Sequence, residues 1–414
     1  MKRFQILLLL VLLSFPLVAQ DTILFMTYNI LNYPGTTSAA RNNHFKVTMN
    51  AVKPDVLVIQ EVTSQIGIDG FLVNVLKTVS PNYNKGAWLD GPDTDNGIFY
   101  DSTKFDFLSN TRVPTELRDI NLFQIRHRIT GDTLFIFSVH LKASNTSADQ
   151  AQRGREVDAI RNITNTWPAG RNFIVCGDFN IYASTEVAYQ KLKAVTAGAE
   201  GHFIDPIVMT GTWNQSQYAI HHTQSPRTRS FEGGTTGGMD DRFDMILFSQ
   251  AISDTGGVEY IRNTTVAYGN DGQHYNDSIN RPSNTAVGQT IANALHYGSD
   301  HIPVLAKFVF KQAPVSVRES EVPSDFRVEN AYPNPFNPVT TIGWTLPQAG
   351  DVNLYVYNAL GQVVSLQNLG YTPAGRGSHL LDASGLASGV YFARLEYLAD
   401  SGASSRIIKL NLMK

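Results

Sequence analysis

The segment at residues 173–180 reads Phe173-Ile174-Val175-Cys176-Gly177-Asp178-Phe179-Asn180. Its first four residues are apolar, and a short continuous apolar run of this kind favours a β-strand that is covered on both faces. Gly177 interrupts the run, and Asp178 and Asn180 follow where the strand would end. The segment therefore predicts a buried strand that brings a carboxylate and an amide to the edge of a sheet.

Five further apolar runs in residues 21–311 have polar residues at one end. Three of them lead into a polar residue: residues 23–28 into Asn29, residues 56–60 into Glu61, and residues 134–139 into His140. Two others follow one: Asp244 precedes residues 245–248, and Asp300-His301 precedes residues 303–310. A single residue of this kind is usually a cap or a turn residue, but six polar ends are difficult to explain by chance. Because enclosed polar groups must pair or bind a metal, we expect these side chains to meet in one pocket.

Helical patterns lie between these runs. Phe45, Met49 and Val52 recur at helical spacing, as do Val157, Ile160 and Ile163 before Trp167, and Ala188, Leu192 and Val195. Strands that are covered on both faces, with helices between them, predict two packed sheets with the helices outside. The expected fold is an α/β fold, a four-layer α/β/β/α sandwich of two mainly antiparallel or mixed sheets.

The polar residues at the strand ends include oxygen ligands for a metal ion. Asn29, Glu61 and Asp300 offer an amide and two carboxylates. The chain has one cysteine, which excludes a disulfide framework and a thiolate zinc cluster. Oxygen ligands favour Mg²⁺, with Mn²⁺ or Ca²⁺ as alternatives.

The remaining strand-end residues suit the hydrolysis of a phosphoester. His140 and His301 titrate near neutrality and can exchange protons with a reacting group or donate hydrogen bonds to it. Asp178 and Asn180, two residues apart, can address an attacking water from one side. A Walker-type phosphate loop is not present, and the glycine-rich stretch at residues 233–238 is interpreted as a flexible loop.

Six motifs in this part of the chain carry a resemblance to a known family. In chain order they are Thr27-Tyr28-Asn29-Ile30-Leu31, Ile59-Gln60-Glu61-Val62, Val139-His140-Leu141-Lys142, Gly177-Asp178-Phe179-Asn180, Arg242-Phe243-Asp244-Met245-Ile246 and Ser299-Asp300-His301-Ile302-Pro303-Val304. Residues 21–311 resemble the endonuclease/exonuclease/phosphatase superfamily, which includes deoxyribonucleases, abasic-site endonucleases, neutral sphingomyelinases and inositol-phosphate phosphatases. One motif alone is weak, but the six together in this order are specific.

The resemblance implies roles for the residues at these positions. It makes Glu61 the principal metal ligand, with Asn29 beside it and Asp300 as a carboxylate on the metal side. It implies that Asp178 and Asn180 position the water and the scissile phosphate, and that His140 binds the phosphate from the opposite wall. It gives His301 the role of general base or transition-state donor, oriented by Asp244. The number of metal ions and the group that takes the proton stay open.

The two ends of the chain carry targeting signals. Residues 1–20 combine Lys2-Arg3, an apolar core and Ala19, which is typical of a secretory signal peptide. A Pro- and charge-punctuated linker is expected at residues 312–331, between a catalytic domain at 21–311 and a small β-sandwich at 332–414. Through the Tyr332–Pro338 motif and Ser388-Gly389-Val390-Tyr391, the sandwich resembles the C-terminal sorting domains of proteins that the type IX secretion machinery exports. We expect a protein that is secreted or on the cell surface, without stable membrane insertion.

Composition limits the possible functions. The net charge is −3, so binding to nucleic acid through bulk positive charge is excluded and any contact with phosphate must be local. The segment 212–229 supplies a local patch of aromatic and basic residues, which is either a phosphate- or base-binding surface or a solvated loop. The leading hypothesis is a monomeric, secreted, metal-dependent phosphodiesterase, a nuclease acting on extracellular DNA or RNA. The alternatives are a phosphomonoesterase, a sphingomyelinase-like lipid phosphodiesterase, and a binding module whose catalytic set has decayed.

Overall fold

The computed structural model describes residues 20–36, 38–231, 233–254, 257–311, 325–399 and 402–414. The chain divides into two compact units, residues 1–314 and residues 315–414. The predicted signal peptide, apart from Gln20, and most of the predicted linker lie outside the described residues. The end of the linker segment, from Asp325, lies within the second unit.

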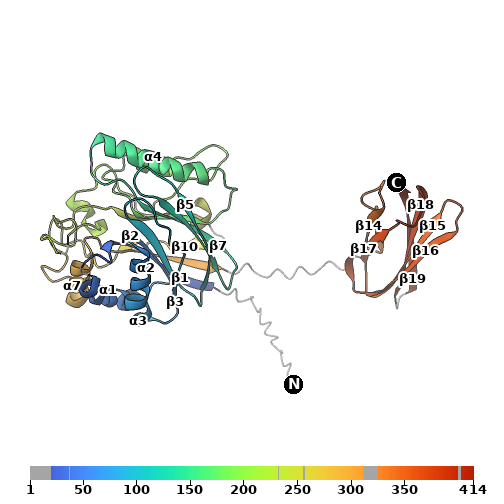
Figure 1. Ribbon diagram of the computed structural model, residues 1–414, viewed down its shortest axis with the longest axis horizontal. Helices are drawn as coiled ribbons and strands as arrows, with labels where there is room; N and C mark the ends of the chain where they lie inside the picture. The colour runs from blue at the N-terminus through green and yellow to red at the C-terminus, as the bar shows by residue number, and fades with distance from the viewer. Residues whose placement is uncertain (1–19, 37, 232, 255–256, 312–324, 400–401) are drawn as a thin grey trace, which may run out of the picture. The chain divides into compact units, whose positions relative to one another are not determined.

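Two sheets form the centre of the first unit (Figure 1). One has the strand order β10-β12-β1-β2-β4-β3, with β11 paired to β12, and the other has the order β5-β6-β7-β8-β9. The pairs β1–β2 and β7–β8 are parallel, and all other pairs are antiparallel. The first sheet comprises β1 (Gln20–Tyr33), β2 (Val56–Val62), β3 (Tyr83–Lys85), β4 (Asp95–Asp101), β10 (Val258–Tyr260), β11 (Val266–Ala267) and β12 (Val304–Lys311). The second comprises β5 (Phe105–Val113), β6 (Ile120–His127), β7 (Thr133–His140), β8 (Phe173–Asp178) and β9 (Asp244–Phe248).

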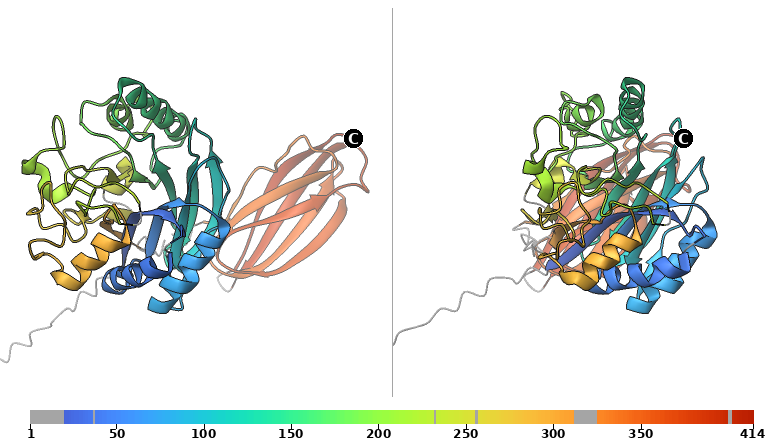
Figure 2. Two further views of the ribbon diagram at one scale, coloured as in Figure 1. Left: turned by 60° about the vertical axis from the view of Figure 1, so that its left-hand side comes forward. Right: turned by 90° about the vertical axis from the view of Figure 1, so that its left-hand side faces the viewer.

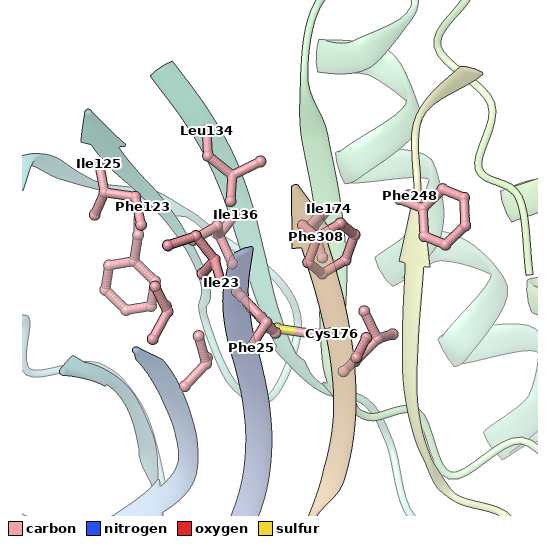
Figure 3. Close-up of a cluster of buried hydrophobic side chains, with 14 of the residues drawn as sticks. Ile23, Phe25, Phe123, Ile125, Leu134, Ile136, Ile174, Cys176, Phe248 and Phe308 are labelled. Carbon is pink, nitrogen blue, oxygen red and sulfur yellow. The ribbon is translucent and has the colours of Figure 1, made fainter. Parts of the chain in front are cut away.

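Alternate side chains of the central strands face opposite layers. Phe25 of β1, Cys176 of β8 and Phe308 of β12 belong to the core between the two sheets, which Figure 3 shows in close-up. Their neighbours Met26 and Val175 instead pack toward the helices. Because both sets are buried, these strands read as continuous apolar runs in the sequence.

Helices cover the outer faces of both sheets (Figures 1 and 2). The covering helices are α1 (Ser38–Val52), α2 (Gln65–Phe71), the π-helical turn η1 (Leu72–Leu76), α3 (Lys77–Val79) and α7 (Gly288–Gly298) on one side, and α4 (Ser147–Thr164) and α5 (Val187–Lys193) on the other. Short helices α6 (Gln250–Ser253) and η2 (Ser216–His221) lie in connections. The predicted four-layer sandwich of mixed sheets is confirmed. The third predicted helix is shorter than its pattern, because α5 ends at Lys193 and Val195 is exposed.

The second unit is a β-sandwich of two small sheets. One contains β13 (Arg327–Val328), β14 (Val339–Leu346) and β17 (Gly375–Asp382), and the other contains β15 (Gly350–Asn358), β16 (Val363–Thr372), β18 (Gly389–Ala399) and β19 (Gly402–Leu412). Phe326, Trp344 and Leu410 contribute to one core between them. The predicted C-terminal β-sandwich is confirmed. Across the described residues of both units, every helix is too short or too polar to cross a bilayer.

Candidate active site

Irregularities at the ends of β1 and β2 aim their polar residues at one point. The parallel pairing shifts register after Asn29, and the pairing of β2 with β4 shifts between Ile59 and Val62. Glu61 lies inside the second shift with φ of 62°, a conformation that is costly for a residue with a side chain and that persists only where its surroundings impose it. Bulges of this kind bend a strand and redirect a side chain. As a result, Asn29 Nδ2 donates to Glu61 Oε1 at 2.9 Å.

Three polar residues stand in one row across the second sheet. Asp178 at the end of β8 lies opposite His140 of β7 and opposite Asp244 of β9. Gly177 makes this approach possible, because a Cβ atom there would lie 2.1 Å from the carbonyl oxygen of Val139. The row brings a carboxylate, an imidazole and a second carboxylate to the same edge.

The backbone after Asp178 turns back on the site. Asn180 has φ of 50°, and its N–H donates to Asp178 Oδ1 at 3.0 Å. The Asn180 side-chain amide donates to the carbonyl of Leu141 at 3.1 Å, beyond the end of β7. This hydrogen bond ties the loop after β8 to the loop after β7.

One oxygen atom, Asp178 Oδ2, joins the two sheets. It lies 3.2 Å from Asn29 Nδ2, 3.5 Å from His140 Nε2 and 3.6 Å from His301 Nε2. His140 Nε2 is also 3.9 Å from Glu61 Oε1. The structure therefore brings Asn29, Glu61, His140, Asp178 and His301 within mutual reach, although they are distant in the sequence.

His301 is held between two carboxylates. Its Nδ1 lies 2.7 Å from Asp244 Oδ2, and its Nε2 lies 2.6 Å from Nε2 of Gln224. Burial disfavours the imidazolium, but the charges of Asp244 and Asp178 outweigh it and hold the pKa of His301 well above its ordinary value. His140 differs, because burial and the positive charges of Arg118 and His301 hold its pKa well below its ordinary value. The pKa values of the two imidazoles in the site are therefore shifted in opposite directions.

Asp300 lies at the same edge and is covered by the glycine-rich loop. Its Oδ2 accepts a hydrogen bond from the backbone N–H of Thr235 at 2.6 Å, and a Cβ atom on Gly234 would approach the same oxygen to 2.7 Å. The Thr235 carbonyl accepts a hydrogen bond from Ser225 Oγ. The stretch interpreted as a flexible loop therefore has a defined contact with a site carboxylate.

The carboxylates of the site are crowded. Burial raises the pKa of Glu61, and the charge of Asp300 raises it further. Burial also raises the pKa of Asp178, and the positive charge of His301 opposes this rise. A raised pKa means that the ionised carboxylate is disfavoured, so the protein's own groups do not fully stabilise the negative charge of Glu61 and Asp178.

The donors that remain suit a hard cation. Glu61 and Asp300 supply carboxylate oxygens, the ligands that Mg²⁺ and Ca²⁺ prefer, and a divalent ion held by them would offset the repulsion between the two. Asn29 turns its amide nitrogen toward Glu61, while its Oδ1 accepts a hydrogen bond from the N–H of Leu31 at 3.0 Å. In the part of the chain that the structure describes, no three His, Cys, Asp or Glu side chains form a ready-made metal group. Mg²⁺ commonly keeps several waters and takes one or two carboxylates, which Glu61 and Asp300 can supply.

Two residues that contact the site were not predicted as site residues. Gln224 contacts His301, and Thr235 contacts Asp300 through its backbone. Gln224 lies in the segment 212–229, which was singled out for its aromatic and basic residues. In that segment His222 and Arg227 are buried, and the His222 ring nitrogens lie 3.0 Å and 3.3 Å from backbone carbonyls. Much of the segment is thus structural rather than a solvated loop.

The two packed sheets, with acids, amides and two histidines at the strand ends, place this chain among the phosphoester hydrolases. The chain belongs to the Endonuclease/Exonuclease/phosphatase family, whose model matches residues 26–301. Enzymes of this family generally use divalent metal ions. A second family model, the secretion system C-terminal sorting domain, matches residues 330–409 and indicates type IX secretion to the cell surface or beyond.

Several solved structures are similar to the first unit. A humanized TDP2 from D. rerio with 14 mutations is 17% identical, with a TM-score of 0.45, over 69% of this chain and 98% of that one. The human Nocturnin catalytic domain with bound sulfate is 18% identical, with a TM-score of 0.41, over 71% and 97%. A mannosyl-6-phosphatase from Bacteroides thetaiotaomicron is 17% identical, with a TM-score of 0.44, over 70% and 100%. A search of curated proteins gave no match.

Proposed function

We propose that this chain is a secreted, divalent-metal-dependent phosphodiester hydrolase that acts as a nuclease on extracellular DNA or RNA. The observation that carries the proposal is the meeting of His140, His301 and Asn29 around one oxygen of Asp178. A carboxylate with two imidazoles and an amide around it can both position a water and contact a phosphoryl group. A decayed binding module would not need to keep this costly buried set intact.

The second sheet and His301 supply the proposed proton and hydrogen-bond chemistry. Asp178 accepts a hydrogen bond from the attacking water, and Asn180 fixes the Asp178 carboxylate through its backbone N–H. His301, oriented by the contact of its Nδ1 with Asp244, donates to a phosphoryl oxygen and stabilises the charge that develops there. His140, which is neutral, contacts the phosphate from the opposite wall.

The first sheet supplies the proposed metal ligands. Glu61 and Asp300 would hold the ion, with Asn29 beside Glu61 and joined to it by the hydrogen bond from Asn29 Nδ2. When bound, a divalent ion polarises a phosphoryl oxygen and stabilises the leaving oxygen. The Thr235 N–H donates to Asp300 Oδ2, so the glycine-rich loop contributes to the position of this carboxylate.

A substrate panel tests the proposal. The full chain would be offered plasmid DNA, RNA, sphingomyelin and inositol phosphates, each with Mg²⁺ and with EDTA. We expect nucleic acid cleavage with Mg²⁺ only. The His301→Ala variant, purified in the same way, controls for contaminating nucleases. Cleavage of lipid or of phosphomonoesters alone would overturn the nuclease assignment, and cleavage of none would favour a binding module.

A further inference from the structure

Gln224 is joined by its backbone to both chain segments that carry the Asp244–His301 pair. It pairs in antiparallel fashion with Asp241, shortly before Asp244, and with His301 itself. Its N–H donates to the carbonyl of Asp241 at 3.1 Å, and its own carbonyl accepts a hydrogen bond from the N–H of Asp241 at 3.0 Å. The backbone of Gln224 is therefore fixed between the two residues of the pair.

The preceding residue, Thr223, connects the same two segments. Its Oγ1 accepts hydrogen bonds from the backbone N–H groups of Phe243 and Asp244, both at 3.1 Å. Its carbonyl accepts a hydrogen bond from the N–H of Ile302, the residue after His301, at 2.8 Å. Residues 223–224 thus tie the chain at Asp244 to the chain at His301.

The side chain of Gln224 extends from this anchored backbone to the ring of His301. Its Nε2 lies 2.6 Å from His301 Nε2, while His301 Nδ1 lies 2.7 Å from Asp244 Oδ2. His301 Nε2 is also 3.6 Å from Asp178 Oδ2, which is too long for a hydrogen bond. A ring held at one nitrogen can still rotate about that contact, whereas contacts at both nitrogens fix its orientation. Gln224 supplies the second contact.

A buried amide at this position has a cost that packing alone does not explain. Gln224 is 8% exposed, and the side-chain hydrogen bond that the structure describes for it is the one with His301. Because a buried amide needs hydrogen bonds to offset its desolvation, an apolar side chain of similar length would fill the same space at lower cost. An amide can act as a donor or as an acceptor, so it can bind His301 Nε2 in either protonation state of the ring. These observations favour a role in orienting His301 over a role in packing.

We propose that Gln224 is a positioning residue, which holds the His301 ring with its Nε2 beside Asp178 until a phosphoryl oxygen takes the place of the amide. The inference rests on the proposed function, in which His301 donates to that oxygen, and it adds the residue that aligns the ring. Alignment before the substrate binds spares the reaction a search for the correct orientation. The amide and the phosphoryl oxygen use the same nitrogen, so removal of the amide does not weaken substrate binding.

The test compares the full chain with its Gln224→Met variant on bis(para-nitrophenyl) phosphate with Mg²⁺. Methionine has a similar length and loses the amide, so we expect kcat to fall about tenfold, which corresponds to about 1.4 kcal/mol of activation free energy, and KM not to rise. Gln224→Asn keeps an amide that is too short to reach the ring, so it should lose kcat to a similar degree. Gln217→Met, at an exposed position in η2, is the matched control and should keep the wild-type constants.

A rise in KM, with or without a loss of kcat, would make Gln224 a substrate-binding residue and would overturn the positioning role. Unchanged constants for Gln224→Met, or wild-type kcat in Gln224→Asn, would also overturn it. If the wild-type chain does not cleave any diester, the proposed function fails, and the positioning role is tested by crystal structures of the wild type and of Gln224→Met. A His301 ring that turns away from Asp178 in the variant would support the role, and an unchanged ring would overturn it.

Discussion

The strand ends of the two units differ in both backbone and burial. In the first unit, Glu61 and Asn180 adopt positive φ without being glycine, and buried acids and histidines gather beside them. In the described residues of the second unit, the positive-φ positions are glycines, such as Gly361 and Gly402, and the buried side chains are apolar except Thr340. Both units have complete apolar cores. The difference shows that the unit with the candidate site also contains the positive-φ residues other than glycine and the buried charges, and that a β-sandwich can fold without either.

The largest effect that this comparison predicts is the loss of activity in His301→Ala. A positioned acid, base or charge donor typically contributes at least about 10²-fold, so turnover should fall by that factor while the circular dichroism spectrum is unchanged. His44→Ala removes a partly exposed histidine that packs against Tyr297, and it should keep full activity. If His301→Ala retained activity within a few-fold of wild type, His301 would have no part in the mechanism.

The second prediction concerns the metal. Glu61→Gln keeps the shape of the side chain but removes the charge, so the Mg²⁺ concentration for half-maximal activity should rise about tenfold or more. The measurement is a Mg²⁺ titration of the initial rate. Glu200→Gln is the matched control, because Glu200 is exposed and accepts only the N–H of Gly170 in the contacts that the structure describes. An unchanged titration for Glu61→Gln would refute its assignment as a ligand.

Much of the fold and of the candidate site was predictable from the sequence, because the residues that determine them are close together in the chain. Strands such as the one at residues 173–176 are continuous apolar runs because both of their faces are buried. The polar residue at one end of each run marks the end of the strand. The contacts of Gln224 with His301 and of Thr235 with Asp300 join residues 77 and 65 positions apart. They lie in a segment with little regular structure, so no hydrophobic period indicates where its side chains point.

The third prediction concerns the cost of buried acids near the catalytic edge. Burial and the charge of Asp240 raise the pKa of Asp241 to about 7, well above its ordinary value. A raised pKa means that the ionised form destabilises the fold, by nothing near pH 4 and fully above pH 7. At pH 8, Asp241→Asn should therefore raise the free energy of unfolding by about 1 kcal/mol, after allowance for partial exposure, and should raise Tm. At pH 4, Tm should be unchanged. An equal Tm difference at both pH values would contradict this explanation.

The smallest predicted effect lies in the second unit. Thr340 Oγ1 donates to the carbonyl of Pro333 at 2.7 Å and thereby holds the segment that precedes β14. Thr340→Val keeps the volume and loses this hydrogen bond, so the local stability should fall by about 1 kcal/mol. Hydrogen exchange of peptides from β14 measures the change, while peptides from β8 and the phosphodiesterase rate should be unaffected. A loss of activity approaching that of His301→Ala would break the comparison, because it would mean that the buried polar groups of the second unit also support the chemistry.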